Sequence, residues 1–157
     1  MLHQELLEHF YHSFKHKDVE GMISCYHNDV EFSDPAFGLL KGDEARNMWR
    51  MLLERNNSLT LDYNNVSADA TSGKANWTAE YVFSRTNRKV VNEVSAQFEF
   101  KDGKIIRHTD TFDLKKWGKQ ALGTIGTILG FTGQLKPVVQ KQAREALSTY
   151  MKERQAK

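Results

Sequence analysis

The chain has 157 residues, of which 39% are hydrophobic and 27% are charged, and its formal net charge is +2 near neutral pH. These values are typical of one ordinary soluble globular domain. The single cysteine, Cys25, excludes an intramolecular disulfide and a cysteine-only zinc site, and it favours a reducing, cytoplasmic location.

Two amphipathic helices are predicted at the start of the chain. Apolar residues recur every three or four positions over residues 2–16, which is the period of a helix with one buried face. Asp18 then stands where an N-cap residue would begin a second, short helix. We expect Asn28 and Asp29 to end that helix.

A short strand, a loop and a third helix should follow. Val30 and Phe32 predict the strand, and Asp34-Pro35 breaks it, because the residue before proline is pushed toward extended conformations. The next residues contain two glycines and are expected to form a mobile or tightly turned loop. The third helix should cover residues 43–55, with acidic residues in its first turn and a basic residue in its last, as the helix dipole favours.

The apolar period changes from about four to two after residue 57, which indicates strands. Four alternating stretches are present, at residues 59–63, 75–83, 94–100 and 106–112. Turn-forming residues separate them, and Asp102-Gly103 is a strong hairpin signal. We therefore predict a largely antiparallel sheet with one face covered by the preceding helices, which is an α+β architecture.

The C-terminal part is predicted to be helical again and to be basic. A helix should run over residues 136–153, after a glycine-rich connection at residues 118–133. Residues 115–157 carry nine basic and two acidic side chains, a balance of +7, whereas residues 1–114 carry 13 basic and 18 acidic ones, a balance of −5. We therefore divide the chain into a domain of residues 1–114 and a basic helical extension of that domain, residues 115–157.

The basic extension has two interpretations. Such a charge asymmetry can mark contact with nucleic acid or with an anionic membrane surface, or it can be the solvated face of a terminal helix. We favour the solvated face, because the basic residues alternate with an apolar stripe and no RNA-binding or zinc-finger motif accompanies them. The most apolar stretch, residues 121–133, is too short for a transmembrane helix. We thus expect no nucleic-acid partner and rank a membrane-surface contact second.

The strand near residues 105–114 carries the most informative residues. Successive side chains of a strand point to opposite faces, so that Ile106, His108, Asp110 and Phe112 share one face. Because apolar residues flank the set, this face should point toward the helices. Buried ionisable groups need a partner, a hydrogen bond or a wet cavity. His108 and Asp110 are therefore either a structural pair or a proton-transfer pair in a pocket, and we favour the pocket.

Asp34 is the second candidate for a chemical role. It lies in an apolar, sterically fixed loop between Phe32 and Pro35, where the pKa of its carboxyl can rise to suit a general base. A turn-making role is an equal alternative, since aspartate before proline is common in turns.

Motifs for metal, phosphate and nucleophilic chemistry do not occur in the sequence. His12 and His16 are four residues apart on the first predicted helix, but no carboxylate or cysteine pattern completes a metal site there. The sequence contains no Walker loop, no dinucleotide glycine fingerprint and no nucleophile elbow. We therefore expect neither a metal nor a cofactor.

Three stretches resemble the nuclear transport factor 2-like superfamily, in particular its SnoaL-like and ketosteroid isomerase-like branch. They are residues 17–22 (KDVEGM), 26–35 (YHNDVEFSDP) and 98–113 (FEFKDGKIIRHTDTFD). The order of the predicted elements over residues 2–114 fits the same superfamily. The resemblance implies a conical α+β domain whose curved sheet wraps a deep apolar cavity, and a homodimer formed through the outer face of the sheet.

The resemblance also implies roles for particular residues. Asp34 matches the catalytic base in the Asp-Pro loop of ketosteroid isomerases, but Phe10 and Ala96 stand where those enzymes have hydrogen-bond donors, so steroid isomerisation of that kind is not expected. Asp110 resembles an acid–base aspartate of SnoaL-like cyclases and epoxide hydrolases. The hydrolases place an arginine between two aspartates, whereas Arg107 has the parity of the opposite face.

The leading hypothesis is a small-molecule-binding SnoaL-like protein. If it is an enzyme, it is a cofactor-independent isomerase, cyclase or hydrolase acting on a polyketide-, steroid- or terpenoid-like compound, with Asp34, His108 and Asp110 as the catalytic residues. The apolar ligand is expected to contact Phe10, Tyr26, Trp49, Trp77, Tyr81, Ala96, Phe98 and Phe112. The alternative is a non-catalytic binding or assembly module whose basic C-terminal helix contacts a partner or a membrane surface.

Overall fold

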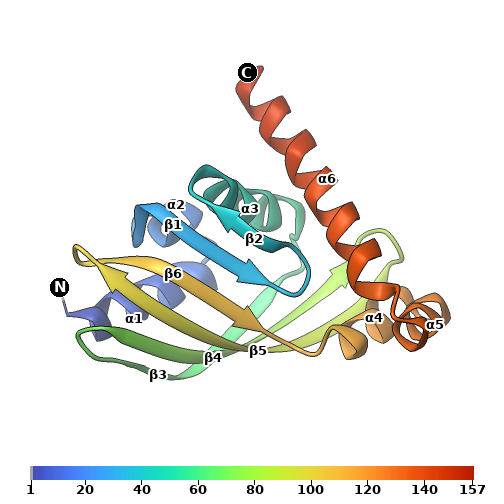
Figure 1. Cartoon of the computed structure of the whole chain (residues 1–157), viewed down its shortest axis with the longest axis horizontal. Helices are drawn as coiled ribbons and strands as arrows, with labels where there is room; N and C mark the ends of the chain where they lie inside the picture. The colour runs from blue at the N-terminus through green and yellow to red at the C-terminus, as the bar shows by residue number, and fades with distance from the viewer. Residues whose placement is uncertain (1) are drawn as a thin grey trace.

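A computed structural model describes residues 2–157, which form six helices and six strands (Figure 1). The helices are α1 (His3–Lys15), α2 (Val19–Ile23), α3 (Asp43–Arg55), α4 (Leu114–Leu122), α5 (Thr124–Thr132) and α6 (Leu135–Gln155). The strands are β1 (Tyr26–Asp34), β2 (Gly38–Lys41), β3 (Thr60–Ala68), β4 (Ser72–Phe83), β5 (Arg88–Lys101) and β6 (Lys104–Thr111).

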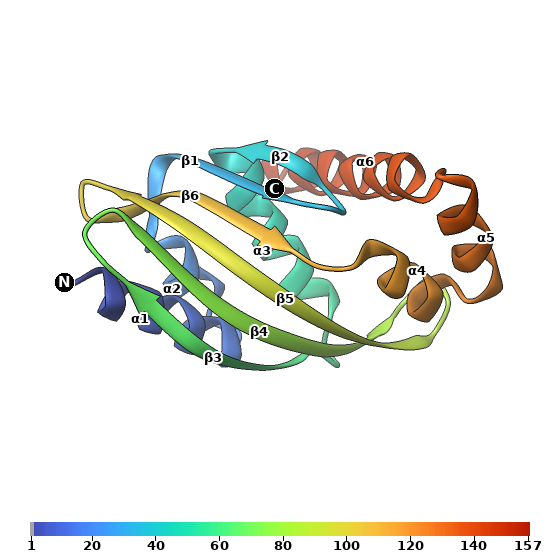
Figure 2. The same cartoon turned by 60° about the horizontal axis from the view of Figure 1, so that its bottom comes forward.

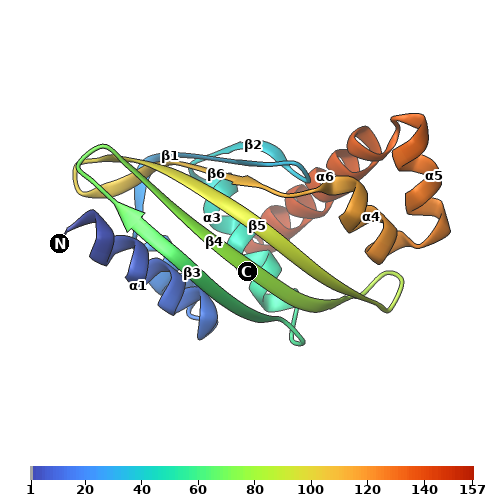
Figure 3. The same ribbon diagram turned by 90° about the horizontal axis from the view of Figure 1, so that it is seen from below.

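The strands form one curved sheet in the order β2-β1-β6-β5-β4-β3. All neighbouring pairs are antiparallel except β1 and β6, which run parallel. Helices α1, α2 and α3 cover one face of the sheet, α4 and α5 lie beyond one end of it, and α6 returns from there toward α3 (Figures 1 and 2). Within residues 2–157 no helix covers the opposite face (Figure 3). The α+β prediction is confirmed.

Most of the predicted elements lie where the sequence places them. Helix α3 has the predicted bounds, and α6 differs from its predicted bounds by one or two residues at each end. Asp18 caps α2, because its side chain accepts a hydrogen bond of 3.0 Å from the backbone N–H of Gly21. The four predicted strands correspond to β3–β6, and Asp102-Gly103 forms the turn of the last hairpin.

Two predictions around the Asp-Pro loop are wrong. The second helix ends at Ile23 rather than at Asn28, because the chain from Tyr26 onward pairs with β6 as strand β1. The expected loop after Asp34 contains a further strand, β2, which returns along β1 as a hairpin. Gly38 lies opposite Asp34 in this hairpin and has a φ of 72°, a conformation that glycine adopts without strain.

The prediction of a glycine-rich connection at residues 118–133 is also wrong, because this segment forms most of α4 and all of α5. Gly123, with a φ of 64°, separates the two helices. A Cβ added to Gly126 would overlap the carbonyl group of Gly118, so the backbones of α4 and α5 touch at this point. The glycines therefore permit close helix packing instead of a flexible loop.

One irregularity corrects the predicted side-chain parity of β6. His108 and Asp110 are both buried, as the alternation predicts, but Ile105 is buried in place of Ile106. The register with β5 shifts between Glu99 and Phe100, so that Ile106 is left over as the extra residue of a bulge. The alternation is therefore reliable only on one side of the bulge.

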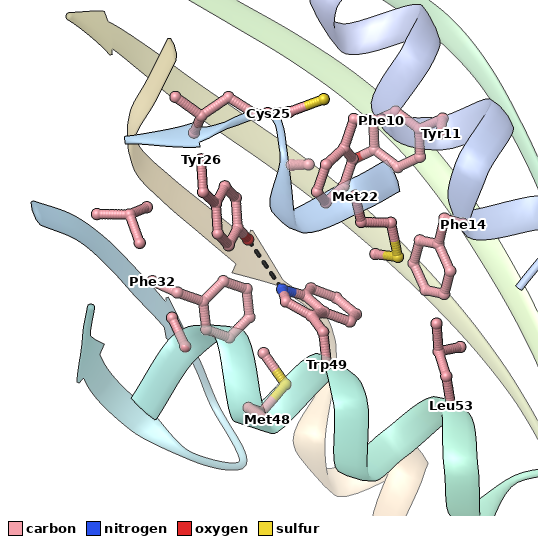
Figure 4. Close-up of a cluster of buried hydrophobic side chains, with 14 of the residues drawn as sticks. Phe10, Tyr11, Phe14, Met22, Cys25, Tyr26, Phe32, Met48, Trp49 and Leu53 are labelled. Carbon is pink, nitrogen blue, oxygen red and sulfur yellow. Dashed lines mark hydrogen bonds between the residues drawn. The ribbon is translucent and has the colours of Figure 1, made fainter. Parts of the chain in front are cut away.

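The main core lies between the helices and the inner face of the sheet, and aromatic side chains of α1, β1 and α3 fill much of it (Figure 4). Helix α6 packs Leu147 and Tyr150 into this core. Near the end of the sheet, Leu135 and Val139 pack with Trp117 in a smaller cluster. None of the helices in residues 2–157 is both long and apolar enough to cross a membrane.

Candidate active site

A cavity of about 310 Å³ lies between the inner face of the sheet and helices α3, α4 and α6. Its wall is mostly apolar, and it includes all three tryptophans of the chain, Trp49, Trp77 and Trp117. Helix α6 contributes Val139 and Ala143 to the same wall. The volume and the lining are typical of a small-molecule site.

A second, larger hollow of about 700 Å³ lies on the outer face of the sheet, over β3–β6. Its lining is mixed and includes the charged side chains of Asp69, Lys74 and Arg107. Neither Asp34 nor Asp110 lines this hollow, whereas both line the inner cavity. The two carboxyl groups singled out from the sequence therefore share the inner site.

Asp34 lies at the end of β1, where the hairpin to β2 begins. Its Oδ1 accepts backbone N–H hydrogen bonds from Ala36 at 2.9 Å and from Phe37 at 2.7 Å. Burial raises the pKa of Asp34 to about 7, against the two backbone hydrogen bonds, which lower it, and the negative charge of Asp110 raises it further. A carboxyl group with this pKa can take up and release a proton near neutral pH.

Asp110 is held by a chain of buried hydrogen bonds. The indole N–H of Trp49 donates to the Tyr26 hydroxyl at 2.9 Å, as Figure 4 shows, and this hydroxyl lies 2.8 Å from Nδ1 of His108. On the other side of the ring, Nε2 of His108 lies 2.8 Å from Oδ1 of Asp110. Both His108 and Asp110 are buried, so these hydrogen bonds lie in the protein interior.

The order of donors in this chain fixes the tautomer of His108. The Trp49 indole can only donate, so the Tyr26 hydroxyl accepts from it and passes its own proton toward Nδ1 of His108. Burial keeps the pKa of Tyr26 well above its ordinary value, so its hydroxyl retains that proton, although the hydrogen bond from Trp49 acts in the opposite sense. His108 then donates from Nε2 to Asp110. The ring therefore accepts a hydrogen bond at Nδ1 and carries its own proton on Nε2.

This arrangement leaves one oxygen of Asp110 available to a ligand. The bond from His108 and a longer contact of 3.5 Å from the Trp77 indole N–H both fall on Oδ1. In the described part of the chain no side chain or backbone group donates to Oδ2, and Asp110 forms part of the cavity wall.

No group of three or more histidine, cysteine, aspartate or glutamate side chains within residues 2–157 is placed to hold a metal ion. The polar side chains of the cavity wall are two carboxyl groups, the guanidinium groups of Arg55 and Arg85, hydroxyl groups and amides.

Comparison with known proteins agrees with the geometry. The sequence profile of the SnoaL-like domain family matches residues 7–108, which is more than half of the chain. The chain belongs to the SnoaL-like domain family. Among curated protein sequences, none matches it.

Solved structures similar to this SnoaL-like chain have its fold at low sequence identity. A putative polyketide cyclase from Pseudomonas putida KT2440 is 21% identical, with a TM-score of 0.63 over 77% of this chain and 98% of that one. An LEH-like epoxide hydrolase from M. tuberculosis is 18% identical, with a TM-score of 0.60 over 84% and 98%. TerC, co-crystallised with polyporic acid, is 21% identical, with a TM-score of 0.59 over 69% and 89%. Structures described as NTF2-like proteins match the chain as well, so the predicted fold of the nuclear transport factor 2-like superfamily is confirmed.

Some of the predicted site residues line the cavity, and others lie in the core behind its wall. The cavity of this SnoaL-like domain is lined by Asp34, Trp49, Trp77, Tyr81, Asp110 and Phe112. The remaining predicted residues pack in the core and do not line it: Phe10, Tyr26, Ala96, Phe98 and His108. His108 thus touches Asp110 from the protein side, in a place suited to positioning that carboxylate.

The cavity wall also contains residues that the sequence did not single out. Trp117 and Leu122 of α4 and several residues of α6 close the cavity from the C-terminal side. The indole N–H of Trp117 donates to the Tyr81 hydroxyl at 2.7 Å, so the proton of that hydroxyl is free to point elsewhere. The apolar stripe of the C-terminal helix was the available signal for this contact, but the stripe alone does not say which surface it covers.

The raised pKa of Asp34 predicts a pH-dependent effect on stability. The pKa of Asp34 is about 7 in the folded protein and 3.8 ordinarily, so the folded state binds the proton more tightly than the unfolded state. This tighter binding contributes to the free energy of unfolding below pH 4, and the contribution is lost as pH rises through 7. Three pKa units correspond to about 4 kcal/mol, which we halve because Asp34 is partly exposed. Asp34→Asn should raise the free energy of unfolding by about 2 kcal/mol at pH 8 and change it little at pH 4. Urea unfolding at both pH values measures this, and equal gains at the two would contradict it.

Proposed function

We propose that the protein binds a small apolar molecule in the inner cavity and catalyses a cofactor-independent acid–base reaction on it. The observation that carries this proposal is the pairing of two unlike carboxyl groups on one apolar wall: Asp34, whose pKa lies near 7, and Asp110, whose Oδ2 faces no protein donor within residues 2–157. A carboxyl group whose pKa lies near neutral pH can act first as a base and then as an acid in the same site.

The proposed reaction is a proton transfer next to a carbonyl group. The Asp34 carboxylate takes a proton from the carbon beside the carbonyl. The electron pair of that C–H bond forms a carbon–carbon double bond, and the π pair of the carbonyl group moves onto its oxygen. The protonated Asp34 then returns a proton to the same or another carbon as the carbonyl group re-forms. Proton balance is kept within the site, so no co-reactant is needed. The result is an isomerisation, or a cyclisation when the intermediate attacks a second carbonyl of the same molecule.

Tyr81 is the group that we propose to stabilise the negative oxygen of this intermediate. It lines the cavity, and it accepts a hydrogen bond from Trp117, which leaves its own O–H free to donate to a ligand. Burial raises the pKa of Tyr81, with the charge of Asp34 acting in the same sense, so the hydroxyl stays protonated at neutral pH. Such a donor acts most strongly inside an apolar site.

Several similar structures are described as putative polyketide cyclases, which supports a small substrate of the polyketide kind, whereas a steroid- or terpenoid-like substrate stays a prediction from the sequence. Epoxide hydrolysis is a weaker candidate. Arg107 lies on the outer face of the sheet, where it pairs with Glu31 and Glu99, so it cannot stand between Asp34 and Asp110.

Deuterium exchange into a fused-ring aromatic ketone tests the proposal. We use α-tetralone in deuterated buffer and follow the loss of the hydrogens beside its carbonyl group by NMR. The wild-type protein should accelerate the loss, and the rate should rise as pH passes about 7, because Asp34 must be deprotonated to act as the base. Asp34→Asn should lower the catalysed rate about 100-fold, and Tyr81→Phe should lower it by a similar factor.

Binding is measured in parallel by intrinsic fluorescence, because every tryptophan of the chain lines the cavity. Asp34→Asn should retain the fluorescence change on adding the ketone. Ala143→Phe, which fills the cavity from α6, should abolish both binding and exchange, whereas Thr149→Phe, at an exposed position of the same helix, should affect neither. Binding without any acceleration, or an unchanged rate in Asp34→Asn, would favour the non-catalytic binding module instead.

The other expectations from the sequence stay predictions. These are the homodimer through the outer face of the sheet, the cytoplasmic location and the division of the chain after residue 114. The structure adds that residues beyond this division line the cavity, so we propose that the C-terminal extension completes the ligand site.

A further inference from the structure

Helix α5 presents an apolar ridge to solvent. Ile125, Ile128 and Phe131 follow one another at a spacing of three, and they are 67%, 56% and 93% exposed. Their spacing places them along one side of the helix, while Gly126 and Gly130 on the other side pack toward α4. Exposed large apolar side chains are ordinary when isolated, but three on one short helix form a patch that indicates an interaction site.

The surroundings of this ridge are positively charged. Residues 122–135 contain no charged side chain, and the nearest acidic residues along the chain are Asp113 and Glu145. Exposed basic side chains occur on the helices before and after α5: Lys115, Lys116, Lys119, Lys136 and Lys141. Within residues 2–157 none of these five lysines forms an ion pair.

Contacts bring part of this charge next to α5. The side-chain carbons of Lys115 lie against Gly130 of α5. From the sheet, the guanidinium of Arg88 lies against Gly123, which precedes α5, and donates to the backbone carbonyl of Gln120 at 2.8 Å. The end of the molecule formed by α4 and α5, which projects beyond the sheet in Figures 1 and 2, therefore carries exposed apolar side chains on α5 and basic side chains on the segments that pack against it.

We propose that α5 docks this end of the protein on the surface of an anionic lipid bilayer. An apolar helical face inserts at the boundary between headgroups and acyl chains, and basic residues around it are attracted by anionic lipids. Such docking is peripheral and needs no helix that crosses the bilayer. It would place α4 and α6, which line the ligand cavity, beside a phase in which apolar molecules dissolve.

A second copy of the chain is a poorer occupant of the same ridge. A two-fold symmetric contact places a surface patch against itself, so the lysines around one ridge would face those of the other. Three side chains are also few for the area of about 800 Å² per partner that a stable interface buries. Charge complementarity thus favours the lipid surface.

Co-sedimentation with vesicles tests the proposal with the full chain. The probes are phosphatidylcholine vesicles with and without phosphatidylglycerol. The protein should sediment with the anionic vesicles and not with the neutral ones, and added salt should weaken the binding. Ile128→Ser/Phe131→Ser should lower the partition coefficient at least about tenfold, and Lys115→Gln/Lys136→Gln should lower it roughly tenfold.

Leu39→Ser is the matched control, because Leu39 is an exposed apolar residue on β2, 49% exposed, and its loss should leave vesicle binding unchanged. Circular dichroism shows whether each variant is folded, and exposed positions such as Phe131 should tolerate serine. Failure to bind anionic vesicles, or equal binding by wild type and the ridge variant, would overturn the proposal. Light scattering would also overturn it if the wild type were a dimer and the ridge variant alone were a monomer, because the ridge would then be the contact with a second copy of the chain. The exchange of α-tetralone in vesicle-free buffer is independent of all these results.

Discussion

His108→Ala is expected to lower the free energy of unfolding by about 3–5 kcal/mol. The imidazole is the central link of the buried chain, so its removal takes the donor from Asp110 and the acceptor from the Tyr26 hydroxyl. Both groups would then be buried without these partners. The removed ring also packs against aromatic neighbours, with Phe98 at 4.4 Å and Phe32 at 5.0 Å between ring centroids.

Urea unfolding near neutral pH measures this effect. His9→Ala is the control, because His9 is exposed on α1 and should change stability by no more than about 0.5 kcal/mol. A double variant, His108→Ala/Asp110→Ala, removes the unpaired carboxylate as well, so it should be more stable than the sum of the two single variants predicts. If His108→Ala lowered the free energy of unfolding by less than about 1 kcal/mol, the buried hydrogen bonds of His108 would not be important for stability.

Of the three residues expected in the pocket, Asp34 and Asp110 line the cavity and His108 does not. The alternation of side chains along a strand could not have predicted this difference. Alternation along β6 correctly places His108 and Asp110 on the buried face. A buried side chain can face a cavity or contact another side chain, and which of the two occurs depends on the residues of the neighbouring strand. Tyr26 is 82 residues away in sequence and occupies Nδ1 of His108, whereas Asp110 lies two residues nearer the end of the sheet where the cavity opens between α3, α4 and α6.

The elements that the sequence missed are those held mainly by tertiary contacts. Strand β2 has only four residues, too few to display a period, and it exists because Gly38 turns the chain back along β1. Helix α5 has two glycines and several β-branched residues, which lower its helix propensity. Its glycines allow a close approach to α4 that no local pattern encodes. Local signals were sufficient for α1, α3 and α6, whose amphipathic stripes are long.

That close approach leads to the second large expected effect. Gly126→Ala should lower the free energy of unfolding by about 3 kcal/mol, because the new methyl group would overlap the carbonyl of Gly118, and a backbone group cannot move aside as a flexible side chain can. Separating α5 from α4 would also disturb Trp117 and Leu122, which line the cavity. The variant should therefore bind a fused-ring ketone more weakly, as tryptophan fluorescence would report.

Gly130→Ala provides a control within the same helix. A Cβ at Gly130 would meet its nearest neighbour, Cγ of Lys115, at 3.5 Å, which is an ordinary contact. Alanine is the better helix former, so this variant should match the wild type or gain up to about 1 kcal/mol. Two glycine-to-alanine changes one helical turn apart should thus act in opposite directions. Similar effects from both would mean that α5 is free to move away from α4, and that the cavity does not depend on their contact.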